Sequence, residues 1–128
     1  MKLEDQVLTK TQVYELINLG FDVGKYASMC IKKDDKTLWQ GKANNYYLPK
    51  YKENYMIDTL TIGDIIDILP KEISFVNKDI PLKLQTDMKS YLRYSSVSNI
   101  ISIKQTETFI DMLFESLKWC IKEKHIAL

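Results

Sequence analysis

Apolar and polar residues alternate with a helical period over the last part of the chain, from Thr108 to Ile126. The apolar positions recur every three or four residues, at Phe109, Met112, Leu113, Leu117, Cys120 and Ile121. This spacing is typical of an amphipathic helix. On the other face Glu115 precedes Lys118, an order that suits the helix dipole and allows an ion pair. We therefore expect a long C-terminal helix, capped by Thr108, that buries a wide apolar stripe.

Two shorter helices are predicted from their capping residues. Thr9 and Gln12 form a capping box, and Gly20 stands where a left-handed residue ends a helix, so residues 9–19 should be helical. Its expected buried face is Val13, Leu16 and Ile17. A second helix should start at Thr61, with Asp64 completing its box, and stop before Pro70. Its expected apolar face is Ile62, Ile65, Ile66 and Leu69.

Strands are indicated in two places. Residues 28–32 and 37–42 are strand-like and flank the polar stretch 33–36, which predicts a hairpin. From Glu72 onward the apolar period changes to two, in the pairs Ile73 and Phe75, Leu82 and Leu84, Leu92 and Tyr94, and Ile101 and Ile103. Turn-like residues separate these pairs, which is typical of an antiparallel meander with one apolar face. The other face carries Lys83, Gln85, Arg93, Ser102 and Lys104.

These elements together predict the α+β class. We expect an antiparallel sheet, made of the hairpin and the meander, with about three helices packed on one face. A chain of 128 residues is most simply one domain, so residues 1–128 are expected to form a single α+β domain.

Composition narrows the function classes. The formal net charge is +1, which gives no overall field toward nucleic acid or an anionic membrane. Arg93 is the only arginine, which weighs against planar, bidentate reading of guanine or phosphate. No apolar run approaches the roughly 18 residues of a membrane helix. We expect a cytoplasmic protein without a membrane partner.

The reactive residues are few and scattered. Cys30 and Cys120 lie far apart, and His125 is the only histidine, so neither a disulfide framework nor a zinc site is indicated. We expect two buried free thiols, with a single disulfide between Cys30 and Cys120 as the alternative, and no metal or cofactor. Asp64 and Asp67 share one helix face as paired carboxylates might, but a solvated face is the commoner reason for such a pair. The usual catalytic sequence signatures are absent.

The most unusual composition lies in residues 43–56, which follow no helix or strand period. The candidate interaction residues there are Tyr46, Tyr47, Lys50, Tyr51, Lys52 and Tyr55. Tyrosine is enriched in protein interfaces, and tyrosines interleaved with lysines also suit stacking on unpaired bases. The plainest alternative is that these rings cover an edge of the protein's own core.

Three blocks carry a resemblance to a known group of proteins. They are LTKTQVYELINLGFDVGKYASMC, TLTIGDIIDILPKEI and FIDMLFESLKWCIKEKHI, in this order. The chain resembles small uncharacterised proteins encoded by phages and integrated mobile elements of Bacteroides-type gut bacteria. Their last block looks like IDALYEMLKWCIENGYI, which residues 110–126 parallel. The resemblance implies an α+β fold and an accessory role in a mobile element, and it carries over no catalytic residue.

Three function hypotheses follow. The first is a non-enzymatic accessory protein of a phage or integrated element, acting through contact with another protein or with a second copy of itself. The second is weak binding of single-stranded nucleic acid through residues 43–56. The third is an enzyme with an unrecognised carboxylate or lysine site.

Overall fold

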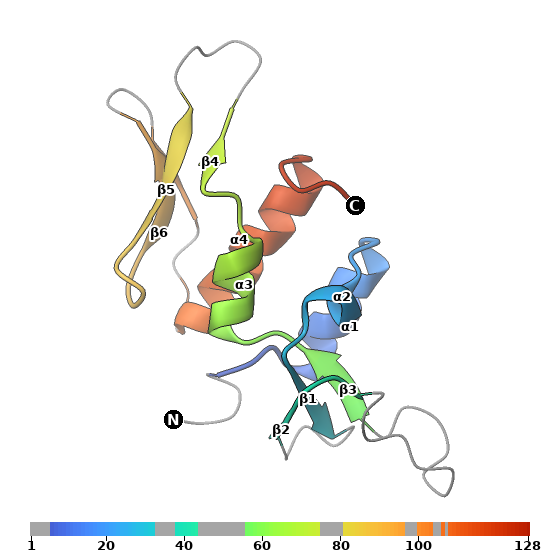
Figure 1. Ribbon diagram of the computed structural model, residues 1–128. Coiled ribbons are helices and arrows are strands. Elements are labelled where there is room, and N and C mark those ends of the chain that lie inside the picture. The colour runs from blue at the N-terminus through green and yellow to red at the C-terminus, as the bar shows by residue number, and fades with distance from the viewer. Residues whose placement is uncertain are drawn as a thin grey trace, which may run out of the picture. The chain divides into compact units, whose positions relative to one another are not determined.

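The computed structural model describes residues 6–32, 38–43, 56–74, 81–96, 100–103, 106 and 108–128 (Figure 1). Contacts divide the chain into two compact units, unit 1 with Met1–Ile68 and Leu128, and unit 2 with Leu69–Ala127. The single domain expected from the chain length stays a prediction. Within the described ranges, every helix is too short or too polar to cross a membrane.

Unit 1 is built on a three-stranded antiparallel sheet. Strand β1 (Met29–Lys32) lies in the middle, between β2 (Leu38–Gln40) and β3 (Met56–Thr59). The pairing of β1 with β2 confirms the predicted hairpin strands, whereas the turn at 33–36 lies outside the described residues. On β1, Cys30 stands opposite Trp39 on one side and opposite Asp58 on the other. Strand β3 was not predicted, because its sequence MIDT begins at the end of the aperiodic stretch 43–56 and shows no alternation of apolar and polar residues.

Helix α1 (Lys10–Asn18) begins and ends as its capping residues predict. The Thr9 hydroxyl accepts the Gln12 backbone N–H, and the Gln12 side chain accepts the Thr9 N–H in return. Gly20 has a φ of +90°, the left-handed conformation that ends the helix. The predicted buried face was wrong at one position: Val13 and Leu16 are buried, but Ile17 is 48% exposed. Ile17 lies about 100° further around the helix than Leu16, beyond the strip that faces the sheet.

Two more helices complete unit 1. The short α2 (Val23–Tyr26) was expected as a loop, and it is capped by Asp22, whose carboxylate accepts the Lys25 N–H. Helix α3 (Ile62–Ile68) starts after Thr61 and stops before Pro70, as predicted. Ile65 is its buried residue.

Unit 2 contains a four-stranded antiparallel meander in the order β4-β5-β6-β7. The strands are β4 (Glu72–Ile73), β5 (Leu82–Thr86), β6 (Leu92–Ser95) and β7 (Ile100–Ser102). The predicted period of two is clearest on β6, where Leu92 and Tyr94 are buried and Arg93 is half-buried between them. Arg93 stands opposite Gln85 on β5 and Ser102 on β7, so these three polar residues form one row across the outward face.

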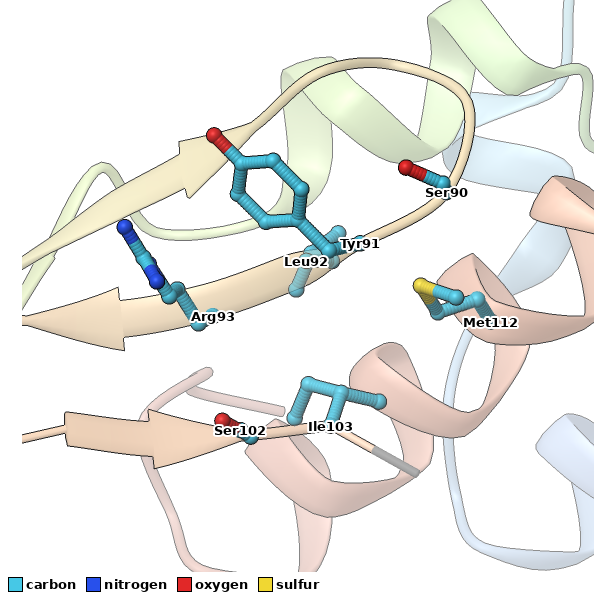
Figure 2. A pocket seen from close by; sticks show the side chains of 7 residues that line it. All are labelled: Ser90, Tyr91, Leu92, Arg93, Ser102, Ile103 and Met112. Carbon is cyan, nitrogen blue, oxygen red and sulfur yellow. The ribbon is translucent and has the colours of Figure 1, made fainter. Parts of the chain in front are cut away.

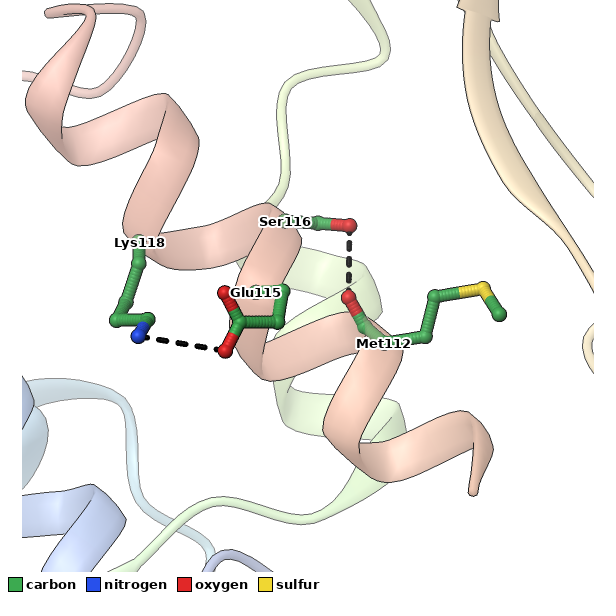
Figure 3. Close-up of polar contacts among 4 residues, drawn as sticks. All are labelled: Met112, Glu115, Ser116 and Lys118. Carbon is green, nitrogen blue, oxygen red and sulfur yellow. Dashed lines mark hydrogen bonds and ion pairs between the residues drawn. The ribbon is translucent and has the colours of Figure 1, made fainter. Parts of the chain in front are cut away.

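The long helix α4 (Phe109–Lys122) contacts β6 within unit 2. Thr108 caps it by accepting the Asp111 N–H at 3.2 Å. The predicted pair of Lys118 and Glu115 is present, with 3.3 Å between Nζ and Oε1 (Figure 3). Ser116 is fully buried, and its hydroxyl donates to the Met112 carbonyl at 2.9 Å, so no polar atom of that side chain is left unsatisfied in the core.

The α+β class and the long C-terminal helix are confirmed. Two details differ from the expectation. The hairpin and the meander belong to separate sheets, because β3 completes the first sheet around β1 and the meander starts a second one. The described residues also hold a fourth helix, α2, besides the three that the sequence predicted.

Leu117→Ala should lower the free energy of unfolding by about 2–5 kcal/mol, because Leu117 is fully buried in α4 and the change leaves a cavity. Lys122→Ala on the exposed side of the same helix is the matched control, and its effect should stay within about 0.5 kcal/mol. Urea titrations of both variants measure this. Equal losses would mean that α4 is rotated relative to the structure described here.

Candidate functional site

All six predicted interaction residues between 43 and 56 lie outside the described residues. This applies to Tyr46, Tyr47, Lys50, Tyr51, Lys52 and Tyr55. The structure does describe the two residues that flank the undescribed stretch, Ala43 and Met56. Both line the same hollow on unit 1.

The unit 1 hollow has a volume of about 210 Å³, and most of the residues that line it are of apolar type. Helix α1 contributes Val13, Tyr14 and Ile17, and α2 contributes Val23 and Gly24. Strand β3 contributes Met56, Ile57 and Asp58, and Ala43 completes the lining. Tyr14 is 40% exposed and Ile17 is 48% exposed, whereas Val13 and Val23 are buried. The hollow therefore has a buried aliphatic floor and two exposed, bulky side chains beside it.

Asp58 is the one charged residue in the described lining of this hollow. Its Oδ1 accepts the Ala43 backbone N–H at 2.6 Å, which ties the chain before the tyrosine-rich stretch to β3. Its Oδ2 accepts no hydrogen bond from the described residues. Glycine at position 24 keeps this side open, since a Cβ there would stand 3.1 Å from Oδ2. The hollow thus offers apolar contact and one carboxylate oxygen.

A second hollow lies on unit 2, with a volume of about 360 Å³ (Figure 2). Its lining runs along β6 and onto β7 and α4, and comprises Ser90, Tyr91, Leu92, Arg93, Ser102, Ile103 and Met112. In Figure 2, Tyr91 and Arg93 rise from the same side of β6, and the Met112 side chain reaches from α4 toward the strands. One end of this hollow is therefore polar and the other is apolar.

The Arg93 guanidinium is held in place by two neighbours. Its Nε donates to Oε1 of Gln85 at 3.0 Å, and its Cζ lies 5.0 Å from the centre of the Tyr91 ring. The sequence identified Arg93 as the only arginine, but not as part of a site. Its partner Gln85 stands opposite it on β5, a pairing that only the fold reveals.

The turn before β6 is ordered by Asp87. Its carboxylate accepts the backbone N–H groups of Lys89, Ser90 and Tyr91, and also the Ser90 hydroxyl. These bonds, the Ser90 hydroxyl foremost, hold the pKa of the Asp87 carboxyl well below its usual range. Asp87 therefore fixes the start of the strand that carries Tyr91 and Arg93.

The two cysteines are buried and free. Burial raises the pKa of the Cys30 thiol, with a further contribution from nearby Asp58. Burial likewise raises the pKa of the Cys120 thiol to about 11. Both thiols are thus protonated near neutral pH, and a protonated thiol is a poor nucleophile. Across the described ranges, no three His, Cys, Asp or Glu side chains are grouped as a metal ion would require.

Of the two helix carboxylates, Asp64 has a structural role. Its Oδ2 accepts the Thr61 N–H at 3.0 Å, and it also accepts the backbone N–H and the hydroxyl of Ser28, at 3.2 and 2.8 Å. Asp64 thereby caps α3 and ties it to the residue before β1. Asp67 is exposed to solvent. Both acids lie on one short helix, but of the two only Asp64 accepts hydrogen bonds from the described residues.

Comparison of the chain with protein-family models, with curated proteins and with solved structures gives no match. The candidate sites are therefore defined by the described residues that line the two hollows.

Asp64→Ala should cost about 1.5–3 kcal/mol of unfolding free energy, because it removes an ionised acceptor shared by three donors. Asp67→Ala is the matched control on the same helix, and its effect should stay within about 0.5 kcal/mol. Chemical denaturation of the two variants measures the difference. If Asp67→Ala proved the more damaging change, the capping role of Asp64 would be refuted.

Proposed function

We propose that this protein acts by binding another protein, and that the unit 1 hollow is its contact surface. The observation that carries the proposal is the exposure of Tyr14 and Ile17 at a hollow lined mostly by apolar residues. Ala43 and Met56, the described residues next to the tyrosine-rich stretch in the sequence, line the same hollow. Large apolar side chains beside a pocket are typical of contact surfaces, since a partner side chain that fills the pocket also covers its rim.

The chemistry of the hollow specifies the partner. Val13, Val23 and Met56 favour an aliphatic or aromatic side chain in the floor. The open Oδ2 of Asp58 favours a lysine or arginine beside that side chain, because a charge-assisted hydrogen bond would satisfy it. The proposed partner segment therefore carries one apolar anchor next to one basic residue.

The sequence supplies the remainder of the proposal. Tyr46, Tyr47, Tyr51 and Tyr55 follow in the chain directly from the hollow and would extend the contact. An accessory role for a phage or integrated element rests on the resemblance of the three sequence blocks. A cytoplasmic location rests on composition.

A photo-crosslinking residue identifies the partner. With p-benzoylphenylalanine in place of Ile17, irradiation in the cells that make the protein should give one discrete adduct. The same residue in place of Glu15, which is exposed on α1 outside the hollow, should not give it. An adduct of two copies of this chain would contradict a heterologous partner, and equal adducts from both positions would contradict the surface.

The identified partner then permits a quantitative prediction. Changing Tyr14 and Ile17 together to alanine should weaken its binding by about 2 kcal/mol or more, as loss of interface anchors does. Glu15→Ala should leave the affinity within about 0.5 kcal/mol. Calorimetric titration measures the affinities, and thermal melts of the same samples check the fold. Unchanged affinity in the double variant would end the proposal.

A further inference from the structure

The only arginine of the chain stands at the unit 2 hollow, although the chain carries 18 basic residues in all. Arginine presents a planar fork of donors, which suits a carboxylate better than the single point charge of lysine. The fork of Arg93 is already oriented, because Gln85 accepts from Nε and the Tyr91 ring lies against the guanidinium. An oriented donor loses little freedom on binding.

The outer nitrogens of Arg93 are the part of the fork that remains for a ligand. Among the described residues, no carboxylate pairs with this guanidinium. The nearest acid of the turn, Asp87, is occupied by the three backbone N–H groups and the hydroxyl described above. Ser102 stands directly opposite Arg93 on β7 and adds a hydroxyl on the same face.

The other end of the hollow is apolar. Leu92 and Met112 are buried, and Ile103 is half-buried beside them. Ile103 is kept next to β6 by its N–H, which donates to the Leu92 carbonyl at 3.2 Å. In Figure 2, the guanidinium lies toward one end of the labelled row and Met112 toward the other. A ligand that uses both ends is therefore elongated, with a charged head and an apolar body.

We infer that the unit 2 hollow binds a small organic monocarboxylate, with its carboxylate on Arg93 and Ser102 and its aliphatic body against Ile103 and Met112. A volume of about 360 Å³ falls within the range of pockets that hold small ligands. A carboxylate fits better than a phosphate because the described lining provides one cation, and most of the remaining contacts are apolar. This site is separate from the proposed protein contact on unit 1.

Octanoate is the probe, and NMR gives a readout at both ends of the site. The Nε–Hε signal of a chain with one arginine belongs to Arg93 without further assignment. The methyl signal of Met112 is identified by its loss in Met112→Leu. We expect octanoate to shift both signals saturably with one common dissociation constant. Octanol, which lacks the charge, and inorganic phosphate, which lacks the apolar body, should bind at least about tenfold more weakly, or about 1.4 kcal/mol.

Two variants separate the fork from mere positive charge. Arg93→Lys keeps the charge and loses the fork, and it should weaken octanoate binding about tenfold, read from the Met112 methyl signal. Lys83→Gln removes an exposed lysine from the neighbouring strand, and it should leave the affinity within about twofold.

Several results would overturn the inference. If inorganic phosphate shifts the Arg93 signal as strongly as octanoate does, the site recognises negative charge alone. If octanol shifts the Met112 signal with the affinity of octanoate, the site recognises apolar surface alone. Shifts at Arg93 without shifts at Met112, or no saturable shift at either, would also reject the site.

Discussion

Unit 2 depends on the burial of the apolar side chains of α4. Leu113, Leu117 and Cys120 are fully buried, and even Ser116 is enclosed, with its hydroxyl returned to the backbone. A leucine such as Leu113 or Leu117 contributes about 1.5–3 kcal/mol when it leaves water, so one helix supplies a large part of the apolar burial. Strand β6 contacts α4, and its side chains Leu92 and Tyr94 are buried as well. Tyr94 is fully buried there, and its hydroxyl donates to the Pro70 carbonyl at 2.8 Å and lies 3.8 Å from Cys120 Sγ. Burial, with this thiol close by, raises the pKa of Tyr94, so the ring is a neutral core residue.

Features that depend on near neighbours in the chain were predictable from the sequence. The capping residues Thr9, Thr61 and Thr108 start their helices as expected, since each bond spans only three residues. The meander was predictable because a period of two survives in short strands. Strand β3 and helix α2 were not, because neither shows a period in its sequence and each depends on contacts with other elements of unit 1: β3 pairs with β1, and α2 contacts α1 and β3.

The candidate sites were far less predictable. The sequence singled out the tyrosines between residues 43 and 56, which lie outside the described residues. It assigned Ile17 to the core, because a hydrophobic period alone does not fix where the covered strip of a helix ends. It placed Gln85, Arg93 and Ser102 on the polar face of the meander, but it did not identify them as a site. That the three stand side by side in one row depends on the register of two strand pairings, which no local pattern encodes.

The described residues that might have carried chemistry serve the fold instead. Asp64 caps α3, Asp87 orders a turn, and the two thiols are buried and protonated. The described residues also line two hollows of different character. The unit 1 hollow is lined mostly by apolar residues and one carboxylate, and the unit 2 hollow by apolar residues, hydroxyls and one guanidinium. This division supports the proposal that the protein acts by binding.

Native-state hydrogen exchange tests most directly the central place of α4 in unit 2. If its buried stripe holds this unit together, the amides of Leu113–Cys120 and of β6 should share the highest protection. They should exchange only when the whole unit unfolds. The exposed turn at Lys89 should open at much lower free energy. Fast exchange along α4, while the β5–β6 amides stay protected, would contradict this account.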